Sequence, residues 1–285
     1  MGVKLNPVRD DEDDDGPGPE LDGLAADEAW DLPAESRGVL LESLASEDRG
    51  VRLEALETLA HSLDDGLAAI ALDLAKSDPD EEVRCAAAVA LGPALAASFQ
   101  WEHGDGAPGP LSPTTVSAMR LGLRHLYFDS ASPSEVRRRA LEAAVQSPEP
   151  WQEGAARAAW ASHDPAWRTT AVACMARLPG FAAELLEALR DREPHVRLEA
   201  ARAAGDGEIH EAAGRLLNLA RAADEDPLVR MAAMESLGLL GDRRSRAPLL
   251  ELAGSADPEL AYAARSALAR IASQNVGYES GDGDV

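Results

Sequence analysis

The sequence is poor in aromatic residues, in lysine and in cysteine. Only 11 of its 285 residues are Phe, Trp or Tyr, and the lysines are Lys4 and Lys76 alone. The formal net charge of −24 is opposite in sign to the Lys- and Arg-rich surfaces that bind phosphate backbones. We therefore expect no binding to nucleic acid.

Cysteine and long apolar runs are also scarce. Cys85 and Cys174 are too few for the disulfide framework of a small secreted domain, and they form no C-x-x-C pair. The N-terminus leads into an acidic string at residues 10–15 instead of a basic stretch with an apolar core, and no run of 18 apolar residues occurs. We expect a cytoplasmic protein that neither spans nor binds a membrane.

Both ends of the chain have the composition of tails. Residues 1–35 carry 12 acidic and two basic side chains, with too few large apolar groups to offset the entropy of ordering. We predict a mostly disordered acidic tail over 1–35, in which the segment 21–32 with Trp30 could form a short helix that docks on the first ordered element. Residues 274–285 contain three glycines and no basic residue, and they predict a second, flexible tail.

Between the tails, seven segments align with one another. Neighbouring segments lie about 30 residues apart, except for one pair whose spacing is about twenty residues too long. The excess falls at the Gly- and Pro-rich residues 99–113, which predict an inserted loop. The segments align on these anchor residues: Val51, Val83, Val136, Trp167, Val196, Val229 and Leu260.

Each segment has the pattern of a helix. Alanine stands four residues after every anchor and a small residue stands seven after it, so that these positions share one helix face. Asp-Pro or Ser-Pro just before several anchors is typical of a helix start. A second apolar, periodic stretch precedes each segment, and residues 36–273 therefore predict a series of helical hairpins.

The motif D-P-x-V-R-x-x-A-x-x-A-L, which residues 226–237 carry with Ser236 at the last small position, resembles the HEAT repeat, particularly the bacterial HEAT-like class. The resemblance implies an all-α fold, a right-handed α-solenoid of about seven hairpins with the second helices on the concave side. It also implies a structural ladder between repeats, in which Asp48, Asp164, Asp226 and Asp257 match the acidic partners of the arginines. For the second copy Asp78 and Asp80 both stay open, and copies three and five carry Ser132 and Glu193 instead. The ladder arginines follow six anchors directly: Arg52, Arg84, Arg137, Arg168, Arg197 and Arg230.

Helical geometry also predicts which side of each second helix stays open. Positions one before and three, six and ten after the anchor fall together on the concave side, and they hold nine acids and four bases. We hypothesise that this concave strip binds a protein partner with a basic or mixed-charge segment; a merely solvated helix face is the alternative. The candidate binding residues are Glu54, Glu57, Glu82, Glu135, Arg139, Glu142, Glu199, Arg202 and Glu235.

The inserted loop is a second candidate interface. Trp101 beside His103 is the kind of pair that anchors a partner, although a single Trp can equally fill a gap in its own protein. Glu102, His103 and Asp105 have no second cluster of ligands near them in sequence, and we predict no metal site.

Motifs of known catalytic sites are missing from the sequence. HEAT-like iron hydroxylases that act on a modified lysine carry repeated His-Glu dipeptides, whereas this chain has one, His210-Glu211. We therefore expect a monomeric, non-enzymatic interaction scaffold without a cofactor. Two alternatives stay open: a phycobilin lyase type of HEAT-like protein, which the Ala-Leu-Gly ending at residues 90–92 resembles, and an acidic decoy or immunity-type protein.

Overall fold

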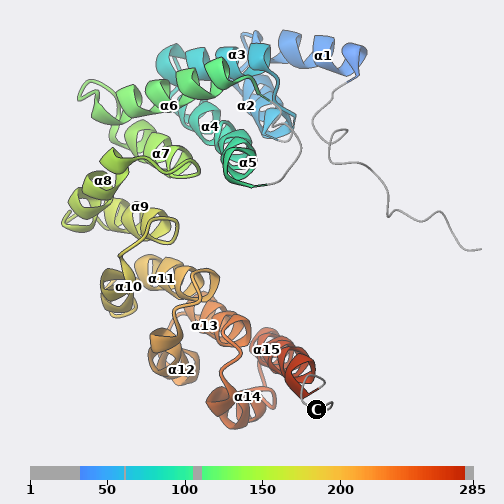
Figure 1. The fold of residues 1–285 in the computed structure, drawn as a ribbon, viewed down its shortest axis with the longest axis vertical. Helices are drawn as coiled ribbons and strands as arrows, with labels where there is room; N and C mark the ends of the chain where they lie inside the picture. The colour runs from blue at the N-terminus through green and yellow to red at the C-terminus, as the bar shows by residue number, and fades with distance from the viewer. Residues whose placement is uncertain (1–32, 61, 105–110, 280–285) are drawn as a thin grey trace, which may run out of the picture.

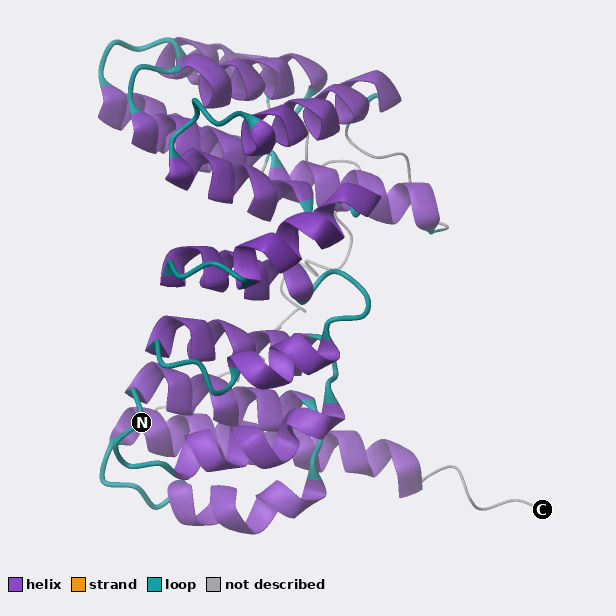
Figure 2. Ribbon diagram, turned by 90° about the vertical axis from the view of Figure 1, so that its left-hand side faces the viewer, coloured by secondary structure: helices purple, strands orange, loops and turns teal. Residues whose placement is uncertain are grey.

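The computed structural model describes residues 33–60, 62–104 and 111–279, which form helices and no strands (Figures 1 and 2). The predicted all-α fold is confirmed, while the right-handed superhelix and the number of hairpins stay predictions. Helices lie in two layers along a C-shaped curve (Figure 1). The inner layer contains α2 (Arg49–Leu59), α4 (Glu81–Ala90), α7 (Ser134–Ala144), α9 (Pro165–Met175), α11 (Pro194–Asp206), α13 (Pro227–Leu239) and α15 (Pro258–Glu279).

The outer layer supplies the first helix of each hairpin, and each outer helix contacts the inner helix that follows it. Two short 3-10 turns, His210–Ala212 and Arg243–Ser245, lead into the last two outer helices. The outer layer contains α1 (Ala34–Leu44), α3 (Asp65–Ser77), α6 (Pro113–Phe128), α8 (Pro150–Trp160), α10 (Ala182–Ala188), α12 (Ala213–Arg221) and α14 (Arg246–Leu252).

Helix starts follow the local sequence. Each of the seven anchors is the third residue of an inner helix. Asp48, Asp80, Asp164 and Asp226 precede inner helices, and their side chains accept backbone N–H groups two residues further on, at 2.7 to 3.0 Å. These bonds satisfy donors that the first turn leaves without a partner, so the acids that precede the anchors fix where the inner helices begin.

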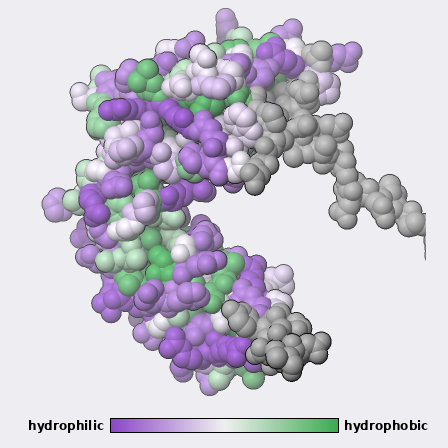
Figure 3. Space-filling view, in the orientation of Figure 1, coloured by the Kyte–Doolittle hydropathy of each residue, from purple (hydrophilic) through white to green (hydrophobic). Residues whose placement is uncertain are grey.

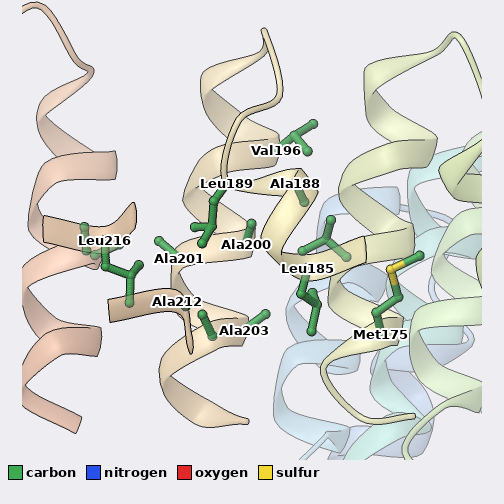
Figure 4. Close-up of a cluster of buried hydrophobic side chains, with 14 of the residues drawn as sticks. Met175, Leu185, Ala188, Leu189, Val196, Ala200, Ala201, Ala203, Ala212 and Leu216 are labelled. Carbon is green, nitrogen blue, oxygen red and sulfur yellow. The ribbon is translucent and has the colours of Figure 1, made fainter. Parts of the chain in front are cut away.

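The core lies between the two layers and is built largely from alanine, leucine and valine. All seven alanines that stand four residues after an anchor are buried. Figure 4 shows this packing around α10 and α11, where Leu185 and Leu189 of the outer helix lie near Ala200 and Ala201 of the inner one. Because small side chains cover most of the contact, the helices can approach one another closely.

Glycines allow still closer contact between neighbouring inner helices. A Cβ atom at Gly205 of α11 would lie 2.7 Å from the Ser236 Oγ of α13, and one at Gly238 would lie 2.9 Å from the Ala267 Cα of α15. The Ser236 hydroxyl donates a hydrogen bond to the Ala201 carbonyl at 2.7 Å. The small residue seven after an anchor therefore packs against the glycine nine after the preceding anchor.

The first inner helix shows what this contact contributes. In α2 the anchor Val51 and the residue seven after it, Thr58, are exposed. In the later hairpins the anchors and the small residues seven after them are mostly buried. No described helix precedes the first hairpin. The exposure of Val51 and Thr58 thus marks an open end of the stack.

Two predicted boundaries were wrong. Part of the predicted loop at 99–113 is helix, because α5 (Gly92–His103) continues from α4 and α6 begins at Pro113. Pro93 occupies the first turn of α5, where a missing N–H costs no hydrogen bond. At the C-terminus α15 continues to Glu279, well into the predicted tail of 274–285. The predicted tail segment 1–32 and residues 280–285 lie outside the described residues.

The continuous stretch Glu81–His103 is long and apolar enough to cross a membrane by length and composition, with a mean hydropathy of 1.3. Half of this stretch is buried inside the protein, and α4 contacts α2, α3 and α7. A core helix of a stacked fold passes the same test, so the stretch is weak evidence for a membrane span.

We predict that Gly205→Ala destabilises the protein by about 1 to 3 kcal/mol, because the new methyl group would force α11 and α13 apart. Gly154 is the matched control, since it is also a helix glycine but a Cβ atom added there would meet no other atom within 4 Å. Gly154→Ala should stabilise the protein by about 0.5 to 1 kcal/mol. Urea unfolding of both variants measures the difference, and equal effects would contradict the close contact.

Candidate functional site

The arginines that follow the anchors make two kinds of contact. Arg52 pairs with Asp78 at 2.9 Å, Arg168 pairs with Asp191 at 2.7 Å, and Arg197 pairs with Glu225. Each acid belongs to the turn between the two helices of the next hairpin. The side chains of Arg52 and Arg168 are about nine-tenths buried, so these pairs lie within the contacts between hairpins.

Two of the three acidic partners, Asp191 and Glu225, differ from those that the resemblance predicted, whereas Asp78 is one of the two acids that it left open for the second copy. Asp48, Asp164, Asp226 and Asp257 accept backbone N–H groups at the helix starts, whereas the ion pairs use Asp78, Asp191 and Glu225. The carboxylates of the first set cap helix starts, and so they do not pair with the arginines as the resemblance implied. The second set reaches the arginines because the turn of the next hairpin lies beside them.

The other three ladder arginines bind no carboxylate within the described residues. The Nε atoms of Arg137 and Arg230 donate to backbone carbonyls ten residues upstream, at 2.8 and 3.2 Å. Arg84 donates to the Ala75 carbonyl and to the Ser132 hydroxyl. The ladder is therefore interrupted at three of its six arginines.

The predicted concave strip lies on the inner helices, but its charges are unevenly distributed. Its part on α2, α4 and α7 has five acids and one base, whereas its part on α9, α11, α13 and α15 has four acids and three bases. Figure 3 shows hydrophilic residues interspersed with small hydrophobic patches over the view of Figure 1, without one continuous apolar band. An acidic character thus belongs chiefly to the first half of the strip.

Exposed carboxylates mark that first half. Glu54 and Glu57 of α2 are exposed and form no ion pair within the described residues. Glu82 of α4 pairs with Arg49 at 2.8 Å, and both side chains are more than half exposed. Exposed ion pairs contribute little energy and exchange readily, so all three carboxylates are available to a partner.

In the middle of the strip the charges are already engaged with one another. Arg139 bridges Glu135 at 2.9 Å and Glu142 at 2.7 Å within α7. The Thr170 hydroxyl of α9 donates to Glu142 at 2.6 Å. This cluster joins two neighbouring hairpins, and its side chains are only partly exposed.

Beyond this cluster, the strip is hollowed. A cavity of about 260 Å³ between α7, α9 and α11 is lined by Glu142, Arg177, Glu199 and Asp206 among others. Burial raises the pKa of the Glu199 carboxyl, and the nearby carboxylates of Glu142 and Asp206 raise it further, whereas Arg202 lowers it.

A larger hollow of about 430 Å³ lies between α13 and α15. Leu228, Met231 and Tyr262 contribute apolar surface there, while Arg202, Glu235 and Arg270 contribute charge. Sequence reasoning had placed Arg202 and Glu235 on the strip but had not indicated a hollow, because Leu228 and Tyr262 belong to different hairpins.

The other predicted interface, Trp101 with His103, lies on α5. Trp101 is half-buried and His103 is exposed, and the His103 ring stacks on the Phe99 ring with centroids 4.2 Å apart. Glu102 pairs with Arg120 of α6 at 2.7 Å. Asp105 lies outside the described residues. Trp101 and His103 are thus fixed on a helix close to α6 and not on a free loop.

Metal-binding clusters are missing from the described part of the chain, where no group of three or more His, Cys, Asp or Glu side chains could hold an ion. Both cysteines there are unbonded. Burial raises the pKa of the Cys85 thiol to about 11, and that of Cys174 well above its ordinary value. Neither thiol is therefore activated as a nucleophile.

Comparisons with known proteins agree with this architecture. A family model described as HEAT repeats matches residues 182–269, which extend from α10 into α15. Over these residues the chain is similar to HEAT repeats. The match falls on the hairpins in which the Arg197 ion pair and the close glycine contacts occur.

Solved structures that match this chain share little sequence with it. Human deoxyhypusine hydroxylase in complex with glycerol is 17% identical. The match covers 85% of this chain and 100% of the hydroxylase chain, with a TM-score of 0.40. The YibA protein of Escherichia coli is 16% identical over 84% of this chain and 82% of its own, with a TM-score of 0.46. An engineered protein is 19% identical over 82% of this chain and 95% of its own, with a TM-score of 0.39.

No curated protein matches the sequence. The likenesses to solved structures concern the course of the chain, and no function is carried over from them.

We predict that Asp191→Ala lowers the free energy of unfolding by about 3 kcal/mol at neutral pH, because the Arg168 guanidinium would stay buried without its partner. Hydrogen bonds from Arg168 and from the Glu193 N–H hold the pKa of the Asp191 carboxyl below its ordinary value against the effect of burial. The stabilisation is therefore present above the ordinary carboxyl pKa and is lost as the pH falls through the lowered one.

Glu251→Gln is the control, since the Arg221–Glu251 pair is 3.8 Å long and exposed, and it should change stability by less than about 0.5 kcal/mol. Denaturant unfolding between pH 7 and pH 3 measures both variants. If Asp191→Ala lowers the free energy of unfolding as much at pH 3 as at pH 7, the ion pair contributes nothing and the account is contradicted.

Proposed function

We propose that this protein is a non-enzymatic scaffold that holds a partner protein along its concave strip. The observation that carries the proposal is the pair of exposed carboxylates of Glu54 and Glu57 beside the exposed Glu82–Arg49 pair. These groups lie on inner helices at the start of a curved stack (Figure 1). HEAT repeats give the repeated framework on which such a surface can be displayed.

The distribution of charge along the strip limits the kind of partner segment that fits it. A segment with Lys or Arg side chains fits the part of the strip on α2 and α4, because long-range attraction steers association and fixes register. Further along, Arg139 already neutralises Glu135 and Glu142, and Arg177, Arg202 and Arg270 bind no carboxylate within the described residues. A mixed-charge partner, with basic groups toward α2 and groups of both signs toward α15, is the best match.

Glu199 supports a role for the strip beyond folding. Burial makes ionisation of its carboxyl unfavourable, as its raised pKa indicates, and Arg202, which lowers that pKa, forms no ion pair with it. A neutral residue would be easier to accommodate at this position. An acid that costs stability in the isolated protein can be compensated when a partner supplies a cation.

We predict that Glu54→Lys with Glu57→Lys removes the partner proteins that the wild type captures from the cells of its source, because both changes reverse the charge of exposed groups. Asp73→Lys with Glu187→Lys is the matched control, since these acids are exposed on outer helices. Quantitative mass spectrometry of the captured proteins is the measurement, and unfolding temperatures establish that both variants fold.

The captured set should be the same for the wild type and the outer-layer control, and it should lose its basic members in the inner-layer variant. Capture should also weaken with rising salt, because exposed charges are screened. Identical sets for all three proteins would exclude the concave strip as the binding surface.

A further inference from the structure

Aromatic side chains gather at one edge of the stack, away from the concave strip. Tyr127 and Phe128 end α6, Trp151 lies in the first turn of α8, and Trp167 lies in the first turn of α9. The Tyr127 ring centroid lies 4.8 Å from that of Phe128, 5.4 Å from that of Trp151 and 6.2 Å from that of Trp167. In a chain with 11 aromatic residues, a cluster of four is far from an even distribution.

At Trp167 the cluster departs from the repeat pattern, although the packing of the other hairpins requires no aromatic side chain at this position. Trp167 occupies an anchor position, where Val136, Val196 and Val229 are completely buried. Trp167 is only half-buried, and its indole N–H donates to the exposed Ser134 hydroxyl at 3.0 Å. Phe128 is 57% exposed. Tyr127 itself is buried in the core, whereas Trp167 and Phe128 extend the cluster to the surface.

Arg137 lies between two of these rings. Its guanidinium carbon is 5.9 Å from the Tyr127 ring centroid and 5.7 Å from that of Trp167, within the range of cation–π attraction. Its Nε donates to the Tyr127 carbonyl at 2.8 Å. These contacts hold the guanidinium in place but leave its two terminal nitrogens without a hydrogen-bond acceptor within the described residues.

Acids that could neutralise Arg137 are engaged elsewhere. Asp129 interacts with Arg137 electrostatically, but its oxygens accept hydrogen bonds from the Ala131 N–H and the Ser132 hydroxyl, which lower its pKa. Glu149 accepts from the Trp151 indole at 2.9 Å. At the corresponding ladder positions Arg168 and Arg197 bind a carboxylate with two nitrogens each, and Arg137 lacks the carboxylate that these two arginines have.

An open hollow of about 250 Å³ adjoins this arginine. It is lined by Tyr127, Arg137, Ala158, Ala159, Ser162 and Trp167. One wall is thus a positive charge fixed by stacking, and the others are aromatic rings and small side chains. A planar guanidinium that is held in place binds a carboxylate through two parallel hydrogen bonds, and aromatic walls accept an apolar group beside it.

We propose that the hollow between Tyr127, Arg137 and Trp167 binds a partner segment that presents an acidic side chain next to a large apolar one. The carboxylate binds the two terminal nitrogens of Arg137, since the Nε already donates to the Tyr127 carbonyl, and the apolar side chain packs on Trp167. Trp, Tyr and Arg, which line this hollow, are the residue types that dominate binding energy at interfaces. The site is independent of the concave strip, so each can fail without the other.

Titration with two blocked five-residue peptides tests the proposal, one with glutamate between two leucines and one with glutamine in its place. The full chain is used, and tryptophan fluorescence is the readout because Trp167 forms a wall of the site. We expect the glutamate peptide to bind at least tenfold more tightly than the glutamine peptide. Arg137→Gln should reduce the affinity for the glutamate peptide to that for the glutamine peptide.

Arg230→Gln is the matched control, since Arg230 makes the same backbone contact without aromatic walls, and it should leave both affinities unchanged. Arg137→Lys keeps the charge but not the planar fork, and it should give an intermediate affinity; it also serves if Arg137→Gln does not fold. Equal affinity for the two peptides, no binding at millimolar concentration, or an equal loss in Arg230→Gln would each overturn the proposal.

Discussion

Contact between neighbouring inner helices is the constraint on which the rest of the structure depends. One hairpin cannot bury its apolar face alone, and each must share that face with the next. Here the shared face is built from very small residues, such as Gly205 against Ser236 and Gly238 against Ala267. The helices can therefore approach closely, and any side chain added at the contact would displace the whole of the following hairpin.

The same constraint divides the charged residues into groups with different tasks. Aspartates at the helix starts satisfy backbone donors, as Asp164 does, and acids in the turns neutralise the arginines between hairpins, as Asp191 does. The charged residues that have neither of these two tasks are informative. Glu54 and Glu57 on the concave strip and Arg137 at the aromatic edge lack ion-pair partners within the described residues, and they are the groups on which the two proposals rest.

Much of the fold could be predicted because its determinants are local. Anchors, alanines and capping residues recur in sequence, and every anchor takes the same place in its helix. The end of α5 was missed because the segment 99–113 as a whole is rich in Gly and Pro, although its first residues continue the helix as far as His103. The ladder partners were missed because Asp191 and Glu225 reach their arginines only across hairpins. The aromatic cluster was missed for the same reason, although a Trp at the anchor position 167 was a usable signal.

Hydrogen exchange of the native protein, resolved by residue, tests most directly the claim that stability comes from contacts between neighbouring hairpins. We expect the slowest exchange in α7, α9 and α11, which have neighbours on both sides, and faster exchange toward α2, where Val51 and Thr58 are exposed. Exchange should also quicken toward α15 at the other end. Uniform protection from α2 to α15, or slowest exchange in α2, would contradict the account.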